Sequence, residues 1–172
     1  MPDIYPFEFL GPDYSKADEW MRYSLNYKFV SEKSNHSYIV RIESYVHDLY
    51  CVKFYDEGSD RYGRFSQRSG TYEPRRIFRT VAAIALDVLK RNSSASFFFI
   101  GAADEKDRRG VSTRRYVVYS QFVKNTTLIP PFFEHFEVEY QSMYVLLNRN
   151  AVPDLQEFMQ MILAYADIDR FQ

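Results

Sequence analysis

The fold of this chain is decided by residues 73–123, which read EPRRIFRTVAAIALDVLKRNSSASFFFIGAADEKDRRGVSTRRYVVYSQFV. Apolar residues recur in its first part at spacings of four, three and four, at Ile77, Val81, Ile84 and Val88. This spacing is the period of an amphipathic helix. Pro74 suits the first helical turn, and Lys90 and Arg91 suit the last turn, where cations face the negative end of the dipole. We therefore predict a helix over Pro74–Arg91.

A strand and a second helix should follow this helix. After a turn, the apolar run Ser96–Ile100 is typical of a strand buried on both faces. A helix of about 18 residues is about 27 Å long, and a strand of about 7 residues covers about 23 Å. The strand can therefore run back along the helix, so that its end at Gly101 lies near Pro74. The second helix, predicted over Ser112–Val123, would then begin at the same edge of the domain.

Apolar and polar residues alternate in five further segments, which predicts strands there. These segments are Asn26–Glu32, His36–Val46, Leu49–Asp56, His135–Gln141 and Met143–Arg149. We also predict an extended N-terminal arm over residues 1–13, a short helix over Tyr14–Leu25, a Gly/Ser/Arg-rich loop over Glu57–Tyr72 and a C-terminal helix from about Pro153. The whole chain, residues 1–172, is predicted to be a single α+β domain. Its mostly antiparallel sheet of about six strands would pack against two or three helices.

The composition limits the class of protein. The chain has 172 residues, enough for one domain with a sizeable core. Aromatic residues make up 18% of it, which favours a thick aromatic core over an aromatic contact surface. No apolar run approaches the length of a membrane span, and no signal peptide pattern is present. Cys51 is single and cannot form an intramolecular disulfide. We therefore expect a cytoplasmic protein that has no membrane association.

The net charge of −1 conceals an uneven distribution of charge. Residues 61–115 hold thirteen Lys and Arg against five Asp and Glu, a net charge of +8. The segments before and after this basic block have net charges of −5 and −4. Two interpretations are open at this point. The basic block pairs with the acidic flanks of the same chain, or it faces an anionic partner.

Arginines gather at the starts of the two predicted helices, where cations oppose the helix dipole unless an anion compensates. Ser112 or Thr113 would cap the second helix and leave backbone N–H groups directed outward. The hypothetical anion-binding residues are Arg75, Arg76, Arg79, Arg108, Arg109, Ser112, Thr113, Arg114 and Arg115. The alternative is that these arginines pair internally with carboxylates of adjoining loops. Those carboxylates are Asp56, Glu57, Asp60, Asp104 and Asp107.

Signatures of catalysis are largely missing from the sequence. The three histidines, His36, His47 and His135, have no neighbours at ligand spacing and are typical of surface or turn residues. No nucleophile elbow, P-loop or dinucleotide fingerprint occurs. The acidic residues of 104–107 alternate with cations, which favours a self-neutralised loop over a metal site. We predict no catalytic residue, no metal site and no cofactor.

The order of elements resembles a family of small uncharacterised bacterial proteins, a domain of unknown function. The resemblance rests on an apolar strand, then Asp and Arg residues, then an Arg-rich helix start that leads into aromatic residues. Here these are Phe97–Ile100, Asp104, Arg108, Arg109, Arg114, Arg115, Tyr116 and Tyr119. The usual Trp near the end of that helix is absent, and Gln121 and Phe122 stand in its region. The resemblance implies the fold and no activity.

The sequence favours a non-catalytic interaction domain with an arginine-rich, anion-facing edge. Its partner would be a nucleic acid, another polyanion or a protein, and its oligomeric state stays open. The alternative is a small nucleic-acid-acting protein, such as a metal-independent ribonuclease or a toxin-like protein. Retention on heparin with a steep salt dependence, without cleavage of RNA, would distinguish binding from catalysis.

Overall fold

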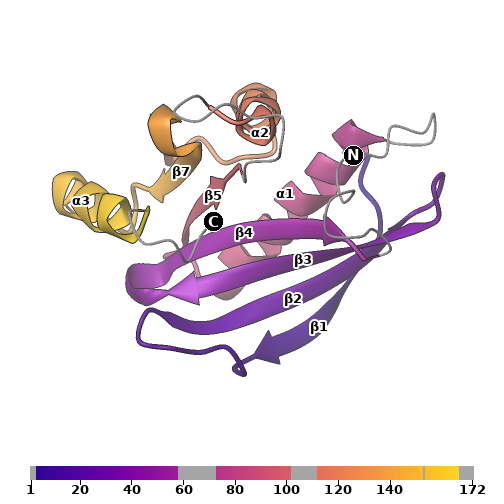
Figure 1. Cartoon of the computed structure of the whole chain (residues 1–172), viewed down its shortest axis with the longest axis horizontal. Coiled ribbons are helices and arrows are strands. Elements are labelled where there is room, and N and C mark those ends of the chain that lie inside the picture. Colours follow the sequence, from indigo (N-terminus) through magenta and orange to yellow (C-terminus); the bar gives the residue numbers. More distant parts are fainter. Residues whose placement is uncertain (1–2, 58–72, 102–111, 153, 167–172) are drawn as a thin grey trace. The chain divides into compact units, whose positions relative to one another are not determined.

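The computed structural model describes residues 3–57, 73–101, 112–152 and 154–166. They belong to two compact units, Met1–Ser93 and Ser94–Gln172 (Figure 1). Within the described ranges the chain forms seven strands and three α-helices, which confirms the α+β class with one strand more than predicted. The prediction that residues 1–172 form a single domain stays a prediction. No helix in the described ranges is long and apolar enough to cross a membrane.

The first unit is built on an antiparallel meander of four strands in the order β1-β2-β3-β4. The strands are β1 (Phe7–Asp13), β2 (Met21–Ser31), β3 (His36–Tyr45) and β4 (Leu49–Asp56). The β2–β3 connection contains Asn35 at φ 58°, and the β3–β4 connection contains His47 at φ 62° and Asp48 at φ 55°. Left-handed residues of this kind are typical of tight turns, so β2–β3 and β3–β4 are joined as hairpins.

One strand was not predicted from the sequence, and it lies in the predicted N-terminal arm. The second half of this arm forms β1, which pairs with β2 in the register Phe7↔Phe29. The register shifts between Phe9 and Gly11, and Gly11 has a φ of 102°, a conformation that favours glycine. Pro12 is tolerated because β1 is the edge strand of the meander. The bulge and the proline interrupt the alternation of apolar and polar residues by which the other strands were predicted.

The short helix predicted over Tyr14–Leu25 is wrong. The chain turns before Met21, where β2 begins. Asp18 causes the turn, because its Oδ1 accepts hydrogen bonds from the backbone N–H groups of Trp20 and Met21, each at 2.8 Å. A side chain that binds nearby backbone donors in this way competes with helix formation.

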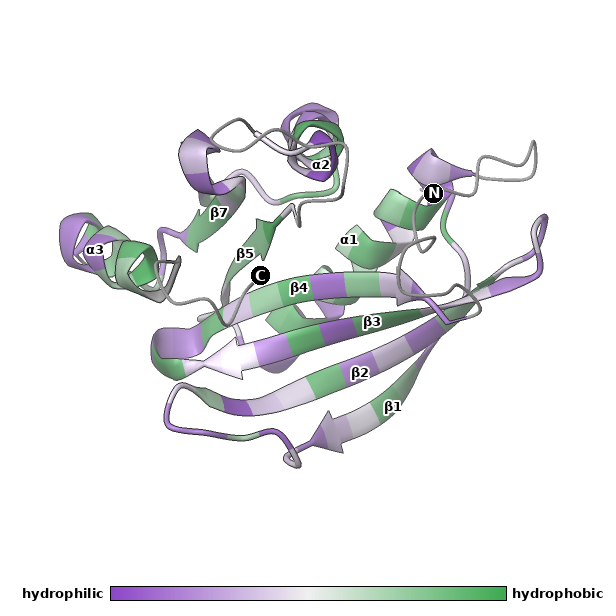
Figure 2. Ribbon diagram, in the orientation of Figure 1, coloured by the Kyte–Doolittle hydropathy of each residue, from purple (hydrophilic) through white to green (hydrophobic). Residues whose placement is uncertain are grey.

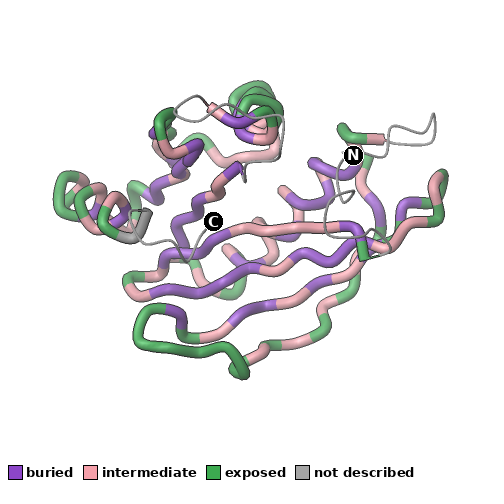
Figure 3. Tube along the Cα trace, in the orientation of Figure 1, coloured by how far each residue is buried: buried purple, intermediate pink, exposed green. Residues whose placement is uncertain are grey.

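Helix α1 (Pro74–Arg91) has the predicted bounds and covers one face of the meander. Its buried residues include Ile77, Val81, Ile84 and Val88, the predicted apolar stripe. Phe78 packs edge-to-face on Phe54 of β4, with ring centroids 5.9 Å apart. Figure 3 shows β3, the strand between β2 and β4, buried along most of its length. The core of this unit therefore lies between α1 and the middle strands.

The second unit contains a three-stranded antiparallel sheet in the order β5-β7-β6. Its strands are β5 (Ser96–Ile100), β6 (Phe133–Val138) and β7 (Met143–Asn148), and its helices are α2 (Arg114–Asn125) and α3 (Leu155–Ala166). Figure 2 shows β5 and β7 as largely apolar, as a buried strand pair requires. Strand β6 ends earlier than predicted, because Glu139–Gln141 form a 3-10 turn.

Candidate functional site

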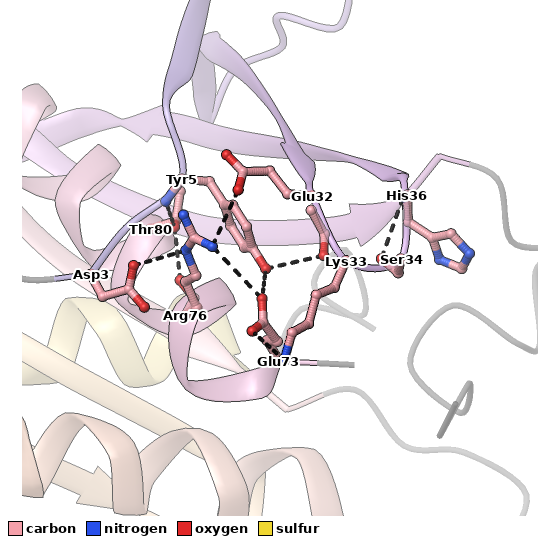
Figure 4. Close-up of polar contacts among 10 residues, drawn as sticks. Asp3, Tyr5, Glu32, Lys33, Ser34, His36, Glu73, Arg76 and Thr80 are labelled. Atoms are coloured by element: carbon pink, nitrogen blue, oxygen red, sulfur yellow. Dashed lines mark hydrogen bonds and ion pairs between the residues drawn. The ribbon is translucent and has the colours of Figure 1, made fainter. Parts of the chain in front are cut away.

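Tyr5 is the centre of a polar cluster at the N-terminal end of α1 (Figure 4). Its side chain is fully buried and stacks on Phe29, with ring centroids 5.7 Å apart. Its backbone N–H donates to Thr80 Oγ1 of α1 at 2.9 Å. Its hydroxyl donates to the carboxylate of Glu73 and lies 3.1 Å from Ser31 Oγ. The N-terminal arm is thereby fixed against both α1 and the end of β2.

Arg76 lies over this tyrosine, with its guanidinium carbon 3.9 Å from the centroid of the Tyr5 ring. Three carboxylates surround the guanidinium. Asp3 Oδ1 is 3.0 Å from Nε, and carboxylate oxygens of Glu32 and Glu73 are 3.7 and 3.9 Å from Nη1. Arg76 therefore pairs inside the protein, with carboxylates other than those that the sequence suggested. Two of its three partners come from the acidic N-terminal flank.

The charges of this cluster support one another. The hydrogen bond from the Tyr5 hydroxyl lowers the pKa of Glu73, and the nearby cations of Lys33 and Arg76 lower it further. Burial raises the pKa of Tyr5, and the carboxylate of Glu73 beside it raises this pKa further. Lys33 Nζ lies 3.3 Å from Glu73 Oε1. At neutral pH the cluster therefore holds an ionised Glu73 and a protonated Tyr5.

The other two arginines predicted on α1 have different surroundings. Arg75 is exposed, and Arg79 is half-buried. The first turn of α1 carries no acidic residue. Glu73, at the N-cap position, makes no capping hydrogen bond with its side chain, which is directed at Tyr5 instead. The positive end of α1 thus carries arginine side chains without an acidic side chain in the same turn.

The start of α2 is organised by Thr113, one of the two predicted caps. Its Oγ1 accepts a hydrogen bond from the backbone N–H of Tyr116 at 3.1 Å, and its own N–H donates to Ser142 Oγ at 2.9 Å. Ser112, the other candidate, donates its hydroxyl to the backbone carbonyl of Glu139 at 3.2 Å. Thr113 is therefore the N-cap of α2. Ser112, the residue before it, is hydrogen-bonded to the 3-10 turn Glu139–Gln141.

The end of β5 lies against the start of α2. Thr113 Oγ1 donates to the carbonyl of Gly101 at 2.6 Å. A Cβ atom at Gly101 would lie 2.3 Å from the backbone nitrogen of Tyr116, closer than any side chain permits. Glycine at this position lets the two backbones approach each other. Gly101 and the first residues of α2 are therefore in direct contact.

The two arginines that open α2 follow this cap. Arg114 is exposed and Arg115 is half-buried, and the first turn of α2 carries no acidic residue. Arg108 and Arg109 lie outside the described residues, as do the acidic residues of 104–107 and the loop 58–72. Helices α1 and α2 belong to different units, so the predicted meeting of their starts at one edge stays a prediction.

Two histidines have partners that the sequence did not suggest. His36 Nδ1 lies 2.6 Å from Asp56 Oδ2, and the Asp56 side chain is buried. His135 Nδ1 lies 2.6 Å from the hydroxyl of Tyr144, and burial lowers the pKa of His135. His47 lies exposed in the β3–β4 turn. These pairs join neighbouring strands, and nothing in the spacing of the histidines marks them.

Of this cluster, sequence reasoning identified only Arg76 and missed Tyr5 and the carboxylate partners of Arg76, which are Asp3, Glu32 and Glu73. The sequence predicted only an extended N-terminal arm, because the arm's partner at the start of α1 depends on the tertiary structure. Among the described residues, no group of three or more His, Cys, Asp or Glu side chains is arranged to hold a metal ion. Comparison of the chain with protein-family models, curated proteins and solved structures gives no match.

Proposed function

We propose that this chain is a non-catalytic cytoplasmic binding domain whose arginine-bearing helix starts face an anionic partner. The observation that supports it is the start of α2. There an exposed Arg114 and a half-buried Arg115 follow the Thr113 cap, in a first turn without an acidic residue. Backbone N–H groups and the positive end of the dipole at such a start favour phosphate and carboxylate groups.

The start of α1 supports the same proposal in the first unit. Arg75 is exposed there, and Arg79 follows one turn later. Arg108 and Arg109, which lie outside the described residues, belong to the proposed anion-binding residues on the sequence alone. A nucleic acid is the partner that best fits arginines without a dedicated base-reading element, because phosphate contacts require charge and position rather than sequence. A polyanionic protein segment is the other partner that these residues would accept.

The proposed location in the cytoplasm rests on Cys51. Its side chain is 1% exposed, and burial raises the pKa of the thiol to about 12. A single, protonated and inaccessible thiol needs no oxidising compartment. Membership of the small bacterial family that the sequence resembles is likewise a proposal, and it would add the fold and no activity.

A metal-independent ribonuclease is the second candidate, and His135 is the observation that favours it. The residue is exposed as a whole, although partial burial lowers its pKa, and its Nδ1 lies 2.6 Å from the hydroxyl of Tyr144. Histidine is the side chain that most often acts as the general acid or base in such chemistry. Cleavage also requires a second group at the scissile phosphate. His135 is a single candidate group for this chemistry, which leaves binding as the better-supported proposal.

One experiment distinguishes the two candidates. The purified chain is incubated with a labelled single-stranded RNA, first in binding assays at several salt concentrations and then for hours at low salt. The proposed function predicts salt-sensitive retention with intact RNA. Cleavage that disappears in His135→Ala but survives in Arg75→Ala would favour the ribonuclease instead.

A further inference from the structure

We propose that Arg76 is a preformed phosphate-binding site that the chain's own carboxylates, Asp3 and Glu32, keep closed. An RNA phosphate would replace these carboxylates at the guanidinium, so that Asp3 of the N-terminal arm and Glu32 of the β2–β3 turn act as internal competitors of the ligand. This inference rests on the proposed function, because it assigns to Arg76 a regulated role in the proposed binding of an anion. It goes further by naming the residues that regulate access.

The guanidinium is held in place without the two competing carboxylates. Its carbon lies over the Tyr5 ring, 3.9 Å from the ring centroid, and Tyr5 itself is fully buried and hydrogen-bonded to Thr80 and Glu73. Stacking on an aromatic face orients an arginine while its outer N–H groups stay available for an anion. Removal of Asp3 or Glu32 would therefore leave an ordered binding group rather than a mobile side chain.

The two competitors bind Arg76 weakly. The side chains of Asp3 and Glu32 are each 65% exposed, whereas that of Arg76 is only 20% exposed. Ion pairs with a largely solvated partner contribute little net stability. Glu73 differs from both, because its carboxylate is 24% exposed and is held by Tyr5 and Lys33. An incoming anion would therefore displace Asp3 and Glu32 and leave Glu73 in place.

The geometry of the Asp3 contact is also incomplete. Asp3 Oδ1 is 3.0 Å from Nε, yet the Nε–H of Arg76 has no acceptor with hydrogen-bond geometry among the described residues. Asp3 thus compensates the charge of the guanidinium without a directional hydrogen bond. A phosphate group presents several oxygens and can accept two parallel N–H bonds from one guanidinium. The phosphate would therefore satisfy a donor that the carboxylate leaves unsatisfied.

The opposing interpretation is that Asp3 and Glu32 only anchor the N-terminal arm. A matched pair of variants separates the two interpretations. Asp3→Asn and Glu19→Gln each remove one negative charge from an exposed side chain of the same unit. Glu19 precedes β2, whereas Asp3 lies near its far end, and the eleven residues of this strand span about 30 Å. A general charge effect would be the same in both variants.

The test measures the dissociation constant of a labelled single-stranded RNA by fluorescence anisotropy. We expect Asp3→Asn to bind the RNA two to five times more tightly than Glu19→Gln does, and Asp3→Asn with Glu32→Gln to bind more tightly still. In an Arg76→Gln background, the advantage of Asp3→Asn over Glu19→Gln should disappear. Equal affinities of Asp3→Asn and Glu19→Gln would overturn the inference, and that comparison decides even if Arg76→Gln does not fold.

The outcomes also separate this inference from the proposed function. If neither the wild-type chain nor any variant binds RNA, both are wrong. If the wild type binds and Arg114→Ala weakens binding, but Asp3→Asn behaves like Glu19→Gln, only the internal competitor is wrong. A difference between Asp3→Asn and Glu19→Gln that persists without Arg76 would also overturn it.

Discussion

The guanidinium of Arg76 lies 3.9 Å from the centre of the Tyr5 ring, and this contact joins the N-terminal arm to the start of α1. It explains why an arginine from the basic block points into the protein while Arg75, its neighbour in the sequence, stays exposed. It also distinguishes Arg76, which is paired with carboxylates, from Arg75 and Arg114, which are exposed.

The hydroxyl of Tyr5 should contribute measurably to stability. Tyr5→Phe keeps the stacked ring but removes the donor to Glu73 and the contact with Ser31. Loss of a buried hydrogen bond to a charged group lowers the free energy of unfolding by about 1.5–3 kcal/mol. Urea denaturation measures this change. Tyr14→Phe, at a side chain that is 64% exposed, is the control and should change little. Equal stability of the two variants would contradict the role of Tyr5.

Glu73 should make stability depend on pH in the acid range. Because its pKa is lower in the folded than in the unfolded chain, its contribution is present above its ordinary pKa of 4.5. The contribution is lost as the pH falls from 4.5 through the lower folded pKa. Glu73→Gln should therefore lose less stability than the wild type over this range. The free energy of unfolding of both proteins is measured from neutral pH into this range. If the two values fall in parallel, the Tyr5 hydrogen bond does not depress the pKa of Glu73.

Gly101 should tolerate no side chain. In Gly101→Ala the new Cβ would meet the Tyr116 nitrogen at 2.3 Å and Thr113 Oγ1 at 2.6 Å, so the start of α2 would have to shift. Overpacking of this kind lowers the free energy of unfolding by about 1–3 kcal/mol. Thermal melts and the hydrogen exchange of the α2 amides report the change. A variant with unaltered exchange in α2 would argue against the close approach.

The apolar stripe of α1 should be intolerant of charge. Ile84 is fully buried, so Ile84→Asp places an unpaired carboxylate in the core. The expected result is an unfolded chain or a loss of several kcal/mol of stability. Lys90→Asp, on an exposed position of the same helix, is the control and should remain folded by circular dichroism. If Ile84→Asp melts within a few degrees of the wild type, the orientation assigned to α1 is wrong.

The sequence predicted those elements in which one pattern dominates. The period of α1 is uninterrupted and the structure has the same bounds, Pro74–Arg91. The edge strand β1 was predicted only as an extended arm, because Gly11 and Pro12 interrupt its alternation. Before β2, the hydrogen bonds of Asp18 determine the turn, and they outweigh the local spacing that suggested a helix.

In the candidate site, as in the fold, only the features set by local sequence were predictable. The cap of α2 follows from local rules, and Thr113 takes that place. The partners of Arg76 could not be predicted, because Asp3 and Glu32 reach it only through the pairing of β1 with β2 and the packing of the arm on α1. The uneven charge along the sequence left two alternatives, internal pairing or an anionic partner. Internal pairing is what the structure shows for Arg76.

The salt dependence of RNA binding tests the proposed anion-binding surface most directly. The dissociation constant of a labelled single-stranded RNA is measured over a series of salt concentrations for the wild type, for Arg114→Ala with Arg115→Ala, and for Lys16→Ala with Lys28→Ala. Each phosphate contact contributes about 0.7 to the logarithmic slope. The proposal predicts that the arginine pair lowers the slope by about 1.4, and that the lysine pair, which removes the same charge elsewhere, leaves it unchanged. Equal slopes for the two double variants would contradict it.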